Sequence, residues 1–222
     1  LSISAAIFGL VNEGDEVIVI EPFYDSYLAC LSMAGATVKI VTLHAPQFQL
    51  DEQELREAFS DRTKMIIINT PHNPSGTVWS KADMLQLQKL TKDTNIIVLS
   101  DEVYEHIIFD GESHNSICMF SDLKSRSFIT ASFGKTFHNT GWKIGYCCAP
   151  EDLMNEFRKV HQFNVFSVNH PMQKGIADYM KDAETYLGLN DFFQQKRDLF
   201  LSLISESRFK FTPSKGTYFQ ML

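Results

Sequence analysis

Short runs of consecutive apolar residues alternate with longer stretches of helical periodicity from the start of the chain to Pro150. Several runs are apolar at every position and not at every second one, which is typical of strands covered on both faces in a parallel sheet. The expected strands are Glu16–Ile20, Thr37–Thr42, Met65–Asn69, Ile96–Ser100, Ser127–Ala131 and Ile144–Cys148.

The segments between these strands have the pattern of amphipathic helices. We expect an N-terminal helix that ends near Gly14, followed by helices at Asp25–Ala34, Asp51–Ser60 and Lys81–Thr91. The last of these begins after Ser80, a residue that favours the N-cap position. Because strand and helix take turns, the crossovers should be right-handed, and the sequence predicts a doubly wound α/β fold.

The character of the chain changes after Pro150. Three successive helices are expected at Glu151–Gln162, Pro171–Leu187 and Asp191–Ser207, and short apolar pieces follow at 209–211 and 217–219. We therefore predict one large domain over residues 1–165. Residues 166–222 would form connecting helices and the first strands of a smaller C-terminal α/β domain.

The composition of the chain limits which kinds of molecule it is expected to bind. The chain has 222 residues, of which 44% are hydrophobic and 21% charged, as in an ordinary globular protein. A net charge of -7 argues against a general affinity for nucleic acid, although a local basic pocket for one phosphate remains compatible with it. No apolar run approaches the roughly 18 residues of a membrane helix, so we expect no membrane partner.

The four cysteines predict a reducing compartment. Cys30, Cys118, Cys147 and Cys148 show no CxxC spacing, and the last two are adjacent on an expected strand. This arrangement disfavours a disulfide framework and a zinc site, and it favours structural thiols in the cytoplasm. The chain begins without a methionine, which leaves open whether it is a fragment of a longer protein.

Three polar segments come directly after expected strands. They are Asn69–Gly76, Ser100–His106 and Ser132–Lys143. Ligands of open α/β sheets collect outside the carboxyl ends of the strands, so these segments are the candidates for a shared site.

The first segment contains NTPHNPSGT, in which two prolines and a glycine fix a rigid turn around Asn73. A held asparagine amide can donate a hydrogen bond to an anionic oxygen. Taken alone, the motif is at least as typical of a turn in which the asparagine bonds its own backbone.

The second segment places Asp101 just past a buried strand and Tyr104 three residues later. A carboxylate at that depth is costly unless a cation or several donors meet it, so a partner is predicted. A metal bound by Asp101, Glu102, Glu105 and His106 is not expected, because the usual helical ligand spacings are absent.

The third segment, SFGKTFHNTGWKIG, contains Lys135 between Ser132 and Lys143. A lysine that is desolvated or placed beside a second cation loses its proton more easily and becomes a nucleophile toward a carbonyl. Lys143 can supply that second cation, or it can bind a phosphate together with the Ser132 hydroxyl. The same serine and lysine also match the SxxK motif of penicillin-recognising acyl enzymes. That alternative is disfavoured because no SDN or KTG motif accompanies them.

Together the three segments meet the needs of one cofactor, pyridoxal 5'-phosphate. This aldehyde requires a lysine for a Schiff base, a carboxylate opposite its ring nitrogen, donors to its ring hydroxyl, and cations or hydroxyls on its phosphate. Lys135 would form the Schiff base, and Asp101 would face the ring nitrogen. Asn73 and Tyr104 would contact the ring hydroxyl, and Ser132 and Lys143 the phosphate. A buried aspartate that raises the ring nitrogen's pKa by a few units, at about 1.4 kcal/mol each, keeps the ring protonated as an electron sink.

The motifs NPSG, SDEVY, SFGK and GWKIG resemble, in order and separation, those of the class I, fold-type I pyridoxal-phosphate aminotransferases. GDEVIVIEPFYDSY and NTPHNPSGTVW are most similar to the kynurenine, glutamine and methionine aminotransferase branch. The resemblance implies a three-layer α/β/α fold with a mostly parallel sheet. It further implies a cofactor-binding domain over 1–165, a truncated small domain within 166–222, and a homodimer.

The resemblance also implies roles for individual residues. Lys135 would hold the cofactor and then act as base and acid, Asn73 would also contact substrate, and Tyr24 would stack on the cofactor ring. The implied reaction moves an amino group from an aromatic, methionine-like or glutamine-like amino acid to a 2-oxo acid. A β-lyase on the same scaffold and an inactive truncated core remain alternatives, since the phosphate-binding loop expected before Leu1 and the carboxylate-binding arginine expected beyond Leu222 are absent from the sequence.

Overall fold

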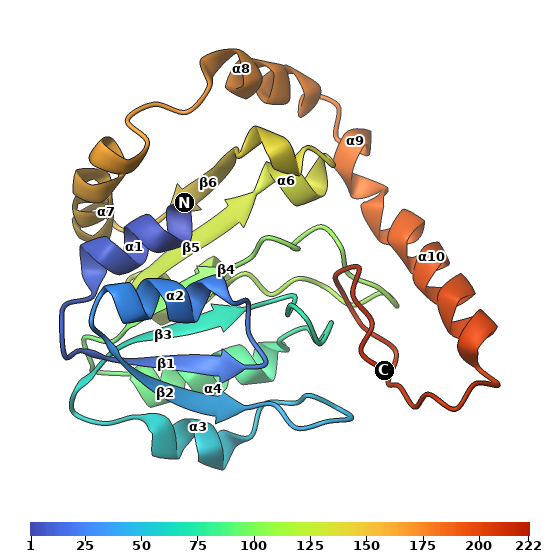
Figure 1. The fold of residues 1–222 in the computed structure, drawn as a ribbon, viewed down its shortest axis with the longest axis horizontal. Helices are drawn as coiled ribbons and strands as arrows, with labels where there is room; N and C mark the ends of the chain where they lie inside the picture. Colours follow the sequence, from blue (N-terminus) through green and yellow to red (C-terminus); the bar gives the residue numbers. More distant parts are fainter.

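A computed structural model describes all residues, 1–222, and its centre is a six-stranded sheet in the order β2-β1-β3-β4-β5-β6 (Figure 1). Every neighbouring pair is parallel except β5 and β6, which are antiparallel. The strands are β1 (Glu16–Glu21), β2 (Thr37–Thr42), β3 (Thr63–Asn69), β4 (Ile97–Asp101), β5 (Ser127–Ser132) and β6 (Gly145–Cys148). The predicted α/β fold with a mostly parallel sheet is confirmed.

Helices cover both faces of the sheet. In chain order they are α1 (Ser2–Leu10), α2 (Ser26–Met33), α3 (Glu52–Ala58), α4 (Lys81–Thr91), α5 (Ser121–Lys124), α6 (Phe133–Thr136), α7 (Glu151–Asn164), α8 (His170–Tyr179), α9 (Glu184–Leu187) and α10 (Leu189–Ile204), with short 3₁₀ turns η1 (Ile117–Met119) and η2 (Thr140–Trp142).

The alternation of side chains along the strands creates two separate cores. Val17 and Val19 of β1 pack on one face with residues of α1, α2 and α7, whereas Ile18 and Ile20 pack on the other with residues of α3, α4 and α5. Because consecutive strand residues point to opposite faces, a strand that is apolar throughout must be covered twice. The result is the expected three-layer arrangement.

Capping residues fix where the helices begin. The Ser80 side chain accepts a hydrogen bond from the Asp83 backbone N–H at 3.2 Å, and the Asp83 carboxylate accepts one from the Ser80 backbone N–H at 2.7 Å, so α4 starts with a complete capping box. Asp51 accepts from the first turn of α3 in the same way. These are the positions that the sequence predicts.

The prediction of one helix over Pro171–Leu187 is wrong. The structure has two helices there, α8 and α9, with a break after Tyr179. The Asp182 carboxylate accepts a hydrogen bond from the Glu184 backbone N–H at 3.1 Å, which satisfies a free donor of a new first turn. Asp182, which lies inside an apparently continuous helical pattern, thus stands just before the start of α9.

The predicted strands at 209–211 and 217–219 are also wrong. The segment after α10 contains only one isolated bridge, between Gly216 and Ile108. Beside it, the Thr217 N–H donates to Ile107 at 2.9 Å and the Phe109 N–H donates to Lys215 at 2.8 Å. A strand needs a partner with a longer row of free backbone groups, and the loop at 107–109 offers only this short one.

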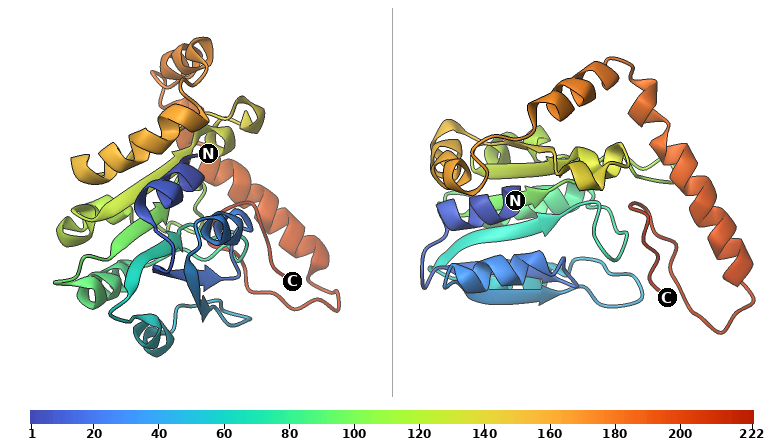
Figure 2. Two further views of the ribbon diagram at one scale, coloured as in Figure 1. Left: turned by 60° about the vertical axis from the view of Figure 1, so that its left-hand side comes forward. Right: turned by 45° about the horizontal axis from the view of Figure 1, so that its top comes forward.

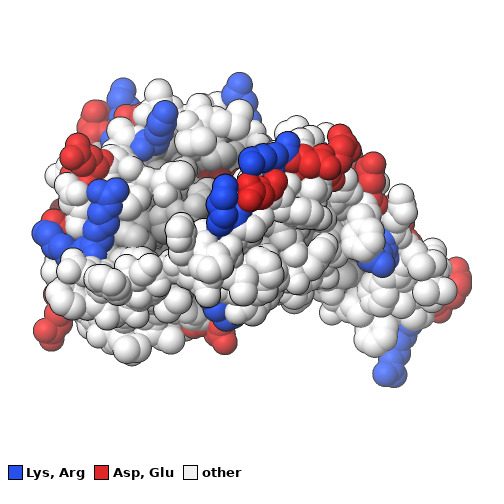
Figure 3. Space-filling model, turned by 90° about the horizontal axis from the view of Figure 1, so that it is seen from above, with Lys and Arg blue, Asp and Glu red and all other residues white.

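The last three helices connect the sheet domain to the C-terminal segment. Figures 1 and 2 show α8, α9 and α10 leaving α7, passing beyond the end of the sheet, and turning back so that the C-terminal segment lies near the loops that follow β3 and β4. None of the helices is both long enough and apolar enough to cross a membrane. On the face shown in Figure 3, basic and acidic side chains are interspersed.

The register of the sheet brings the strand ends level. Asn69 at the end of β3 is paired with Asp101 at the end of β4, which in turn is paired with Thr130 of β5. Ser132, the last residue of β5, is paired with Gly145 of β6. The three polar segments therefore emerge at one edge of the sheet.

A buried histidine connects two of the loops at this edge. His72 is 2% exposed, and its Nδ1 lies 2.6 Å from the Ser75 hydroxyl. Burial lowers the pKa of His72 to about 4, and a hydrogen bond with the backbone of Pro22 opposes this shift. The ring therefore stays neutral near pH 7 and holds the loop after β3 against the loop after β1.

This histidine predicts a pH dependence of stability. The folded-state pKa lies below the ordinary value of 6.5, so the unfolded chain binds the extra proton as the pH falls from about 7 to about 4. Over that range the free energy of unfolding should fall by about 3 kcal/mol on account of His72 alone. Urea unfolding of His72→Gln at both pH values should show a correspondingly smaller loss than the wild type. Equal losses in the two proteins would contradict this assignment.

Candidate active site

All seven residues singled out in the sequence line one pocket at the carboxyl ends of β3, β4 and β5. The pocket has a volume of about 280 Å³, close to the lower end of the range for small-ligand sites. The seven are Tyr24, Asn73, Asp101, Tyr104, Ser132, Lys135 and Lys143.

The most constrained of them is Asp101, the last residue of β4, which is 6% exposed. The Tyr27 hydroxyl donates to its Oδ2 at 2.6 Å, and the Val103 N–H donates to its Oδ1 at 3.3 Å. Burial raises the pKa of Asp101 to about 6 against these hydrogen bonds. No lysine or arginine forms an ion pair with it, so the predicted cation partner does not come from this chain.

Asn69 fixes the turn that carries Asn73. Its Nδ2 donates to the Asp101 backbone carbonyl at 2.8 Å, and its Oδ1 accepts from the Asn73 N–H at 2.7 Å. One side chain thus joins the ends of β3 and β4 to the NPSG turn. The Asn73 side chain lines the pocket from this anchored position.

A tight turn after β5 places Lys135. The Ser132 hydroxyl accepts a hydrogen bond from the Gly134 N–H at 3.1 Å and so begins the short helix α6. A Cβ at Gly134 would lie 2.9 Å from the Thr140 Cα, so only glycine allows this close approach. Lys135, the next residue, is half-buried and its Nζ lies 5.6 Å from the centre of the Tyr218 ring.

Another part of the pocket lining has groups that suit an anion. Lys143 is exposed and adopts a left-handed conformation (φ 57°, ψ 40°) between η2 and β6. Leu1, Ser2 and Ile3 also line the pocket, so the N-terminus of α1 opens on it. A helix N-terminus carries free N–H groups and the positive end of the helix dipole, which favour a phosphate.

Two tyrosines complete the lining. Tyr104 is 2% exposed and packs edge-on against Tyr218 at 5.3 Å between ring centres. Burial raises the pKa of Tyr104 well above its ordinary value, so its hydroxyl remains a hydrogen-bond donor. Tyr24 is 46% exposed and stands edge-to-face against Tyr27 at 5.7 Å, which leaves much of its ring open to the pocket.

Three buried polar residues of the pocket were missed in the sequence: Tyr27, Asn69 and Thr130. Thr130 is 3% exposed, and its hydroxyl has no hydrogen-bond partner, which is uncommon for a buried polar atom. Its position inside an apolar strand concealed it. Tyr27 ends the stretch GDEVIVIEPFYDSY, but its role was not evident there because its partner Asp101 lies 74 residues away.

A separate acidic group overlaps with the one considered in the sequence. The ligand atoms of Glu102, Glu105 and His114 lie within 4.8 Å of one another, and Glu105 also lies 3.8 Å from His106. Glu102 accepts from the Ser100 hydroxyl at 2.8 Å and the Ile117 N–H at 3.1 Å, and lies 2.7 Å from His114. Its carboxylate is therefore already engaged in a network within the chain.

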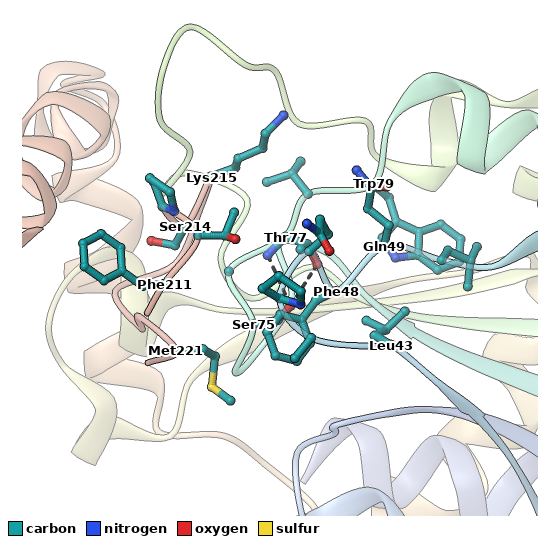
Figure 4. A pocket seen from close by; sticks show the side chains of 18 of the residues that line it. Leu43, Phe48, Gln49, Ser75, Thr77, Trp79, Phe211, Ser214, Lys215 and Met221 are labelled. Carbon is teal, nitrogen blue, oxygen red and sulfur yellow. Dashed lines mark hydrogen bonds between the residues drawn. The ribbon is translucent and has the colours of Figure 1, made fainter. Parts of the chain in front are cut away.

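A second, larger cavity of about 600 Å³ lies beside the NPSG turn, between residues 45–50 and 210–222 (Figure 4). Much of its lining is apolar, including Phe48, Trp79 and Phe211. Of its charged side chains, Lys215 pairs with Glu112 at 2.7 Å, and Asp83 belongs to the cap of α4. The groups suited to covalent and acid–base chemistry gather in the smaller pocket.

Sequence comparison places the chain among known proteins. The family model for aminotransferase class I and II matches residues 2–222. A methionine aminotransferase of Escherichia coli (strain K12) is 47% identical over 219 residues, which cover 98% of this chain and 57% of that protein. A kynurenine–oxoglutarate transaminase of Dictyostelium discoideum is 37% identical over 246 residues, covering 99% and 55%.

Structural comparison agrees. The crystal structure of an Escherichia coli protein with a methionine aminotransferase function superposes with a TM-score of 0.96 at 47% identity, covering 99% of this chain and 58% of that one. The N-succinyldiaminopimelate aminotransferase of Mycobacterium tuberculosis gives a TM-score of 0.93 at 37% identity, covering 98% and 57%.

The chain spans between half and two thirds of the length of these relatives. Within that length the match is continuous, and it includes the strands, the turns and the polar segments that build the pocket. The resemblance seen in the motifs is thus confirmed, and the chain belongs to the class I and II aminotransferase family, in the branch that includes the methionine and kynurenine transaminases.

Proposed function

We propose that the pocket holds pyridoxal 5'-phosphate and transfers an amino group from an amino acid to a 2-oxo acid. The observation that carries the proposal is the buried carboxylate of Asp101, which has no cation in this chain and shares a pocket with Lys135. When bound, the cofactor supplies an aldehyde for covalent attachment and a ring that withdraws electrons from the substrate. The family assignment supports the same cofactor.

The residues present fit this group. A protonated ring nitrogen would give Asp101 the cation that its burial requires. The Thr130 hydroxyl, a buried polar group of the pocket lining without a partner, supports the proposal that a polar ligand binds beside it. Asn73 and Tyr104 are the donors for the ring hydroxyl. For the phosphate, the pocket offers Ser132, Lys143 and the N-terminus of α1.

Lys135 has the central chemical role in the proposal. Its Nζ would hold the cofactor, and the same amine would serve as the base and acid that move a proton of the substrate α-carbon. Its seat on a short helix fixed by Ser132 and Gly134 keeps the amine at the pocket wall. Tyr24 presents its open ring for stacking on the cofactor, and Asn73 is placed to contact substrate.

We infer the substrate class from the relatives. A relative at 47% identity is named for methionine and one at 37% for kynurenine, while others at 37% are named for N-succinyldiaminopimelate. With the motif resemblance, the first two support aromatic, methionine-like or glutamine-like amino donors, with a 2-oxo acid as acceptor. Two alternatives place the cofactor in the same pocket: a β-lyase, and a core that is inactive in isolation. Measurements of cofactor attachment, turnover and products distinguish them from this proposal.

We further propose a homodimer with a cofactor domain over residues 1–165 and a second domain that begins within 166–222. Exposed aromatic side chains at the end of α7 support an additional interface, since Phe163 is 86% exposed and Phe166 80%. A cytoplasmic location is proposed because all four cysteines are free thiols in the structure.

Replacing Lys135 tests the covalent attachment. With added pyridoxal phosphate, the wild-type protein should show a yellow absorbance band that borohydride removes, and Lys135→Ala should show none. Turnover of the variant should fall by at least roughly 10²- to 10⁴-fold, as is usual for the loss of a general acid–base group. Lys174→Ala, a change at an exposed lysine of α8, is the matched control and should keep the band. A reducible band in Lys135→Ala would overturn the assignment.

Product analysis tests the reaction type. With an amino acid and a 2-oxo acid, the wild-type full-length protein should consume the two in equal amounts and form the new amino acid without free ammonia, because the amino group is carried from one to the other. The measurement is product quantification by chromatography, with an ammonia assay on the same samples. Ammonia and 2-oxo acid released in the absence of an acceptor would identify a lyase instead.

A further inference from the structure

We propose that Tyr27 is a positioning residue for Asp101: its hydroxyl holds Oδ2, keeps the carboxyl ionised, and leaves Oδ1 with the capacity to meet a cationic ring. This inference rests on the proposed function, because the cation is the cofactor's ring nitrogen. It gives a role to Tyr27, the last residue of the stretch GDEVIVIEPFYDSY, to which the resemblance assigned none.

The contact is short and buried. The Tyr27 hydroxyl donates to Asp101 Oδ2 at 2.6 Å, within the range of strong O–H···O⁻ hydrogen bonds. Oδ1 accepts only a longer hydrogen bond, at 3.3 Å, from the Val103 N–H. The two oxygens are therefore unequal, and Oδ1 is the one with more unused capacity.

Packing fixes the position of the donor. Tyr27 lies in the first turn of α2, is 2% exposed and belongs to the core on the α1–α2–α7 face of the sheet. Its ring also meets Tyr24 edge-to-face. Because the ring is packed on all sides, its hydroxyl oxygen has one fixed position. The position of the donor to Asp101 is therefore set by the packing of α2 and not by solvent.

The electrostatic effect has a definite sign. Burial favours the neutral form of Asp101, and the hydrogen bond from Tyr27 is the largest contribution that opposes it. Burial raises the pKa of Tyr27 well above its ordinary value, so the phenol keeps its proton and remains the donor.

Other groups face the same carboxyl or its pocket. The Glu102 carboxylate raises the pKa of Asp101, acting with burial and against Tyr27. Tyr104, Tyr24, Lys135 and Lys143 line the pocket from the loops after β4 and β1, from α6 and from the turn before β6. None of them donates a hydrogen bond to Asp101, which leaves Tyr27 as its only side-chain donor.

The test removes the hydroxyl alone. In the full-length protein without cofactor, the Asp101 carboxyl carbon is followed by ¹³C NMR against pH, with the signal assigned by its disappearance in Asp101→Asn. In Tyr27→Phe the proton affinity of Asp101 should rise roughly tenfold to a hundredfold, the usual range for losing a hydrogen bond to a charged group. Tyr179→Phe loses the same atom from an exposed tyrosine and should leave the titration unchanged.

A double-mutant cycle gives a second readout. Tyr27→Phe should weaken pyridoxal phosphate binding roughly tenfold or more in the wild-type background. It should have little effect once Asp101 is replaced by asparagine, because the group it acts through is gone. Equal losses in both backgrounds would indicate a purely structural role and overturn the inference.

The two proposals fail in different ways. An Asp101 titration that is the same in Tyr27→Phe and wild type would overturn the positioning role, whether or not the cofactor binds. Failure of the wild-type protein to bind pyridoxal phosphate would overturn the proposed function, whereas the NMR titration needs no cofactor.

Discussion

A carboxylate buried without a cation is the constraint around which this molecule is organised. Asp101 ends β4 at a depth where an ionised acid is costly, and the chain supplies hydrogen bonds from Tyr27 and Val103 but no positive partner. These hydrogen bonds offset only part of the cost of burial, since the pKa of Asp101 is still raised to about 6, and a cation would offset the rest. In the proposed function that partner is the protonated ring of pyridoxal phosphate, and Lys135 holds the same molecule covalently.

The sheet makes this arrangement possible. Parallel pairing with level ends brings Asn69, Asp101 and Thr130 side by side, and the helices on both faces keep their backbones dry. Asn69 joins the turn after β3 to the end of β4, and His72 joins that turn to the loop after β1. The positions of the pocket side chains therefore depend on the packing of the sheet and on hydrogen bonds at its edge.

Much of this could be predicted from local pattern. Consecutive apolar residues defined all six strands to within two residues at either end. Polar segments directly after strands identified six residues that line one pocket, and the family resemblance added a seventh, Tyr24. What could not be predicted depends on contacts between distant segments. Tyr27 became relevant only through Asp101, the break before α9 depends on one aspartate side chain, and residues 209–219 lack the neighbouring strand that would make them strands.

The account's central claim is that the amine of Lys135 carries the cofactor. The most direct test is to reduce the protein with borohydride in the presence of pyridoxal phosphate, digest it and locate the added mass by peptide mass spectrometry. The account predicts a single modified peptide, labelled at Lys135. Labelling at Lys143 or at another lysine, with Lys135 unmodified, would contradict it.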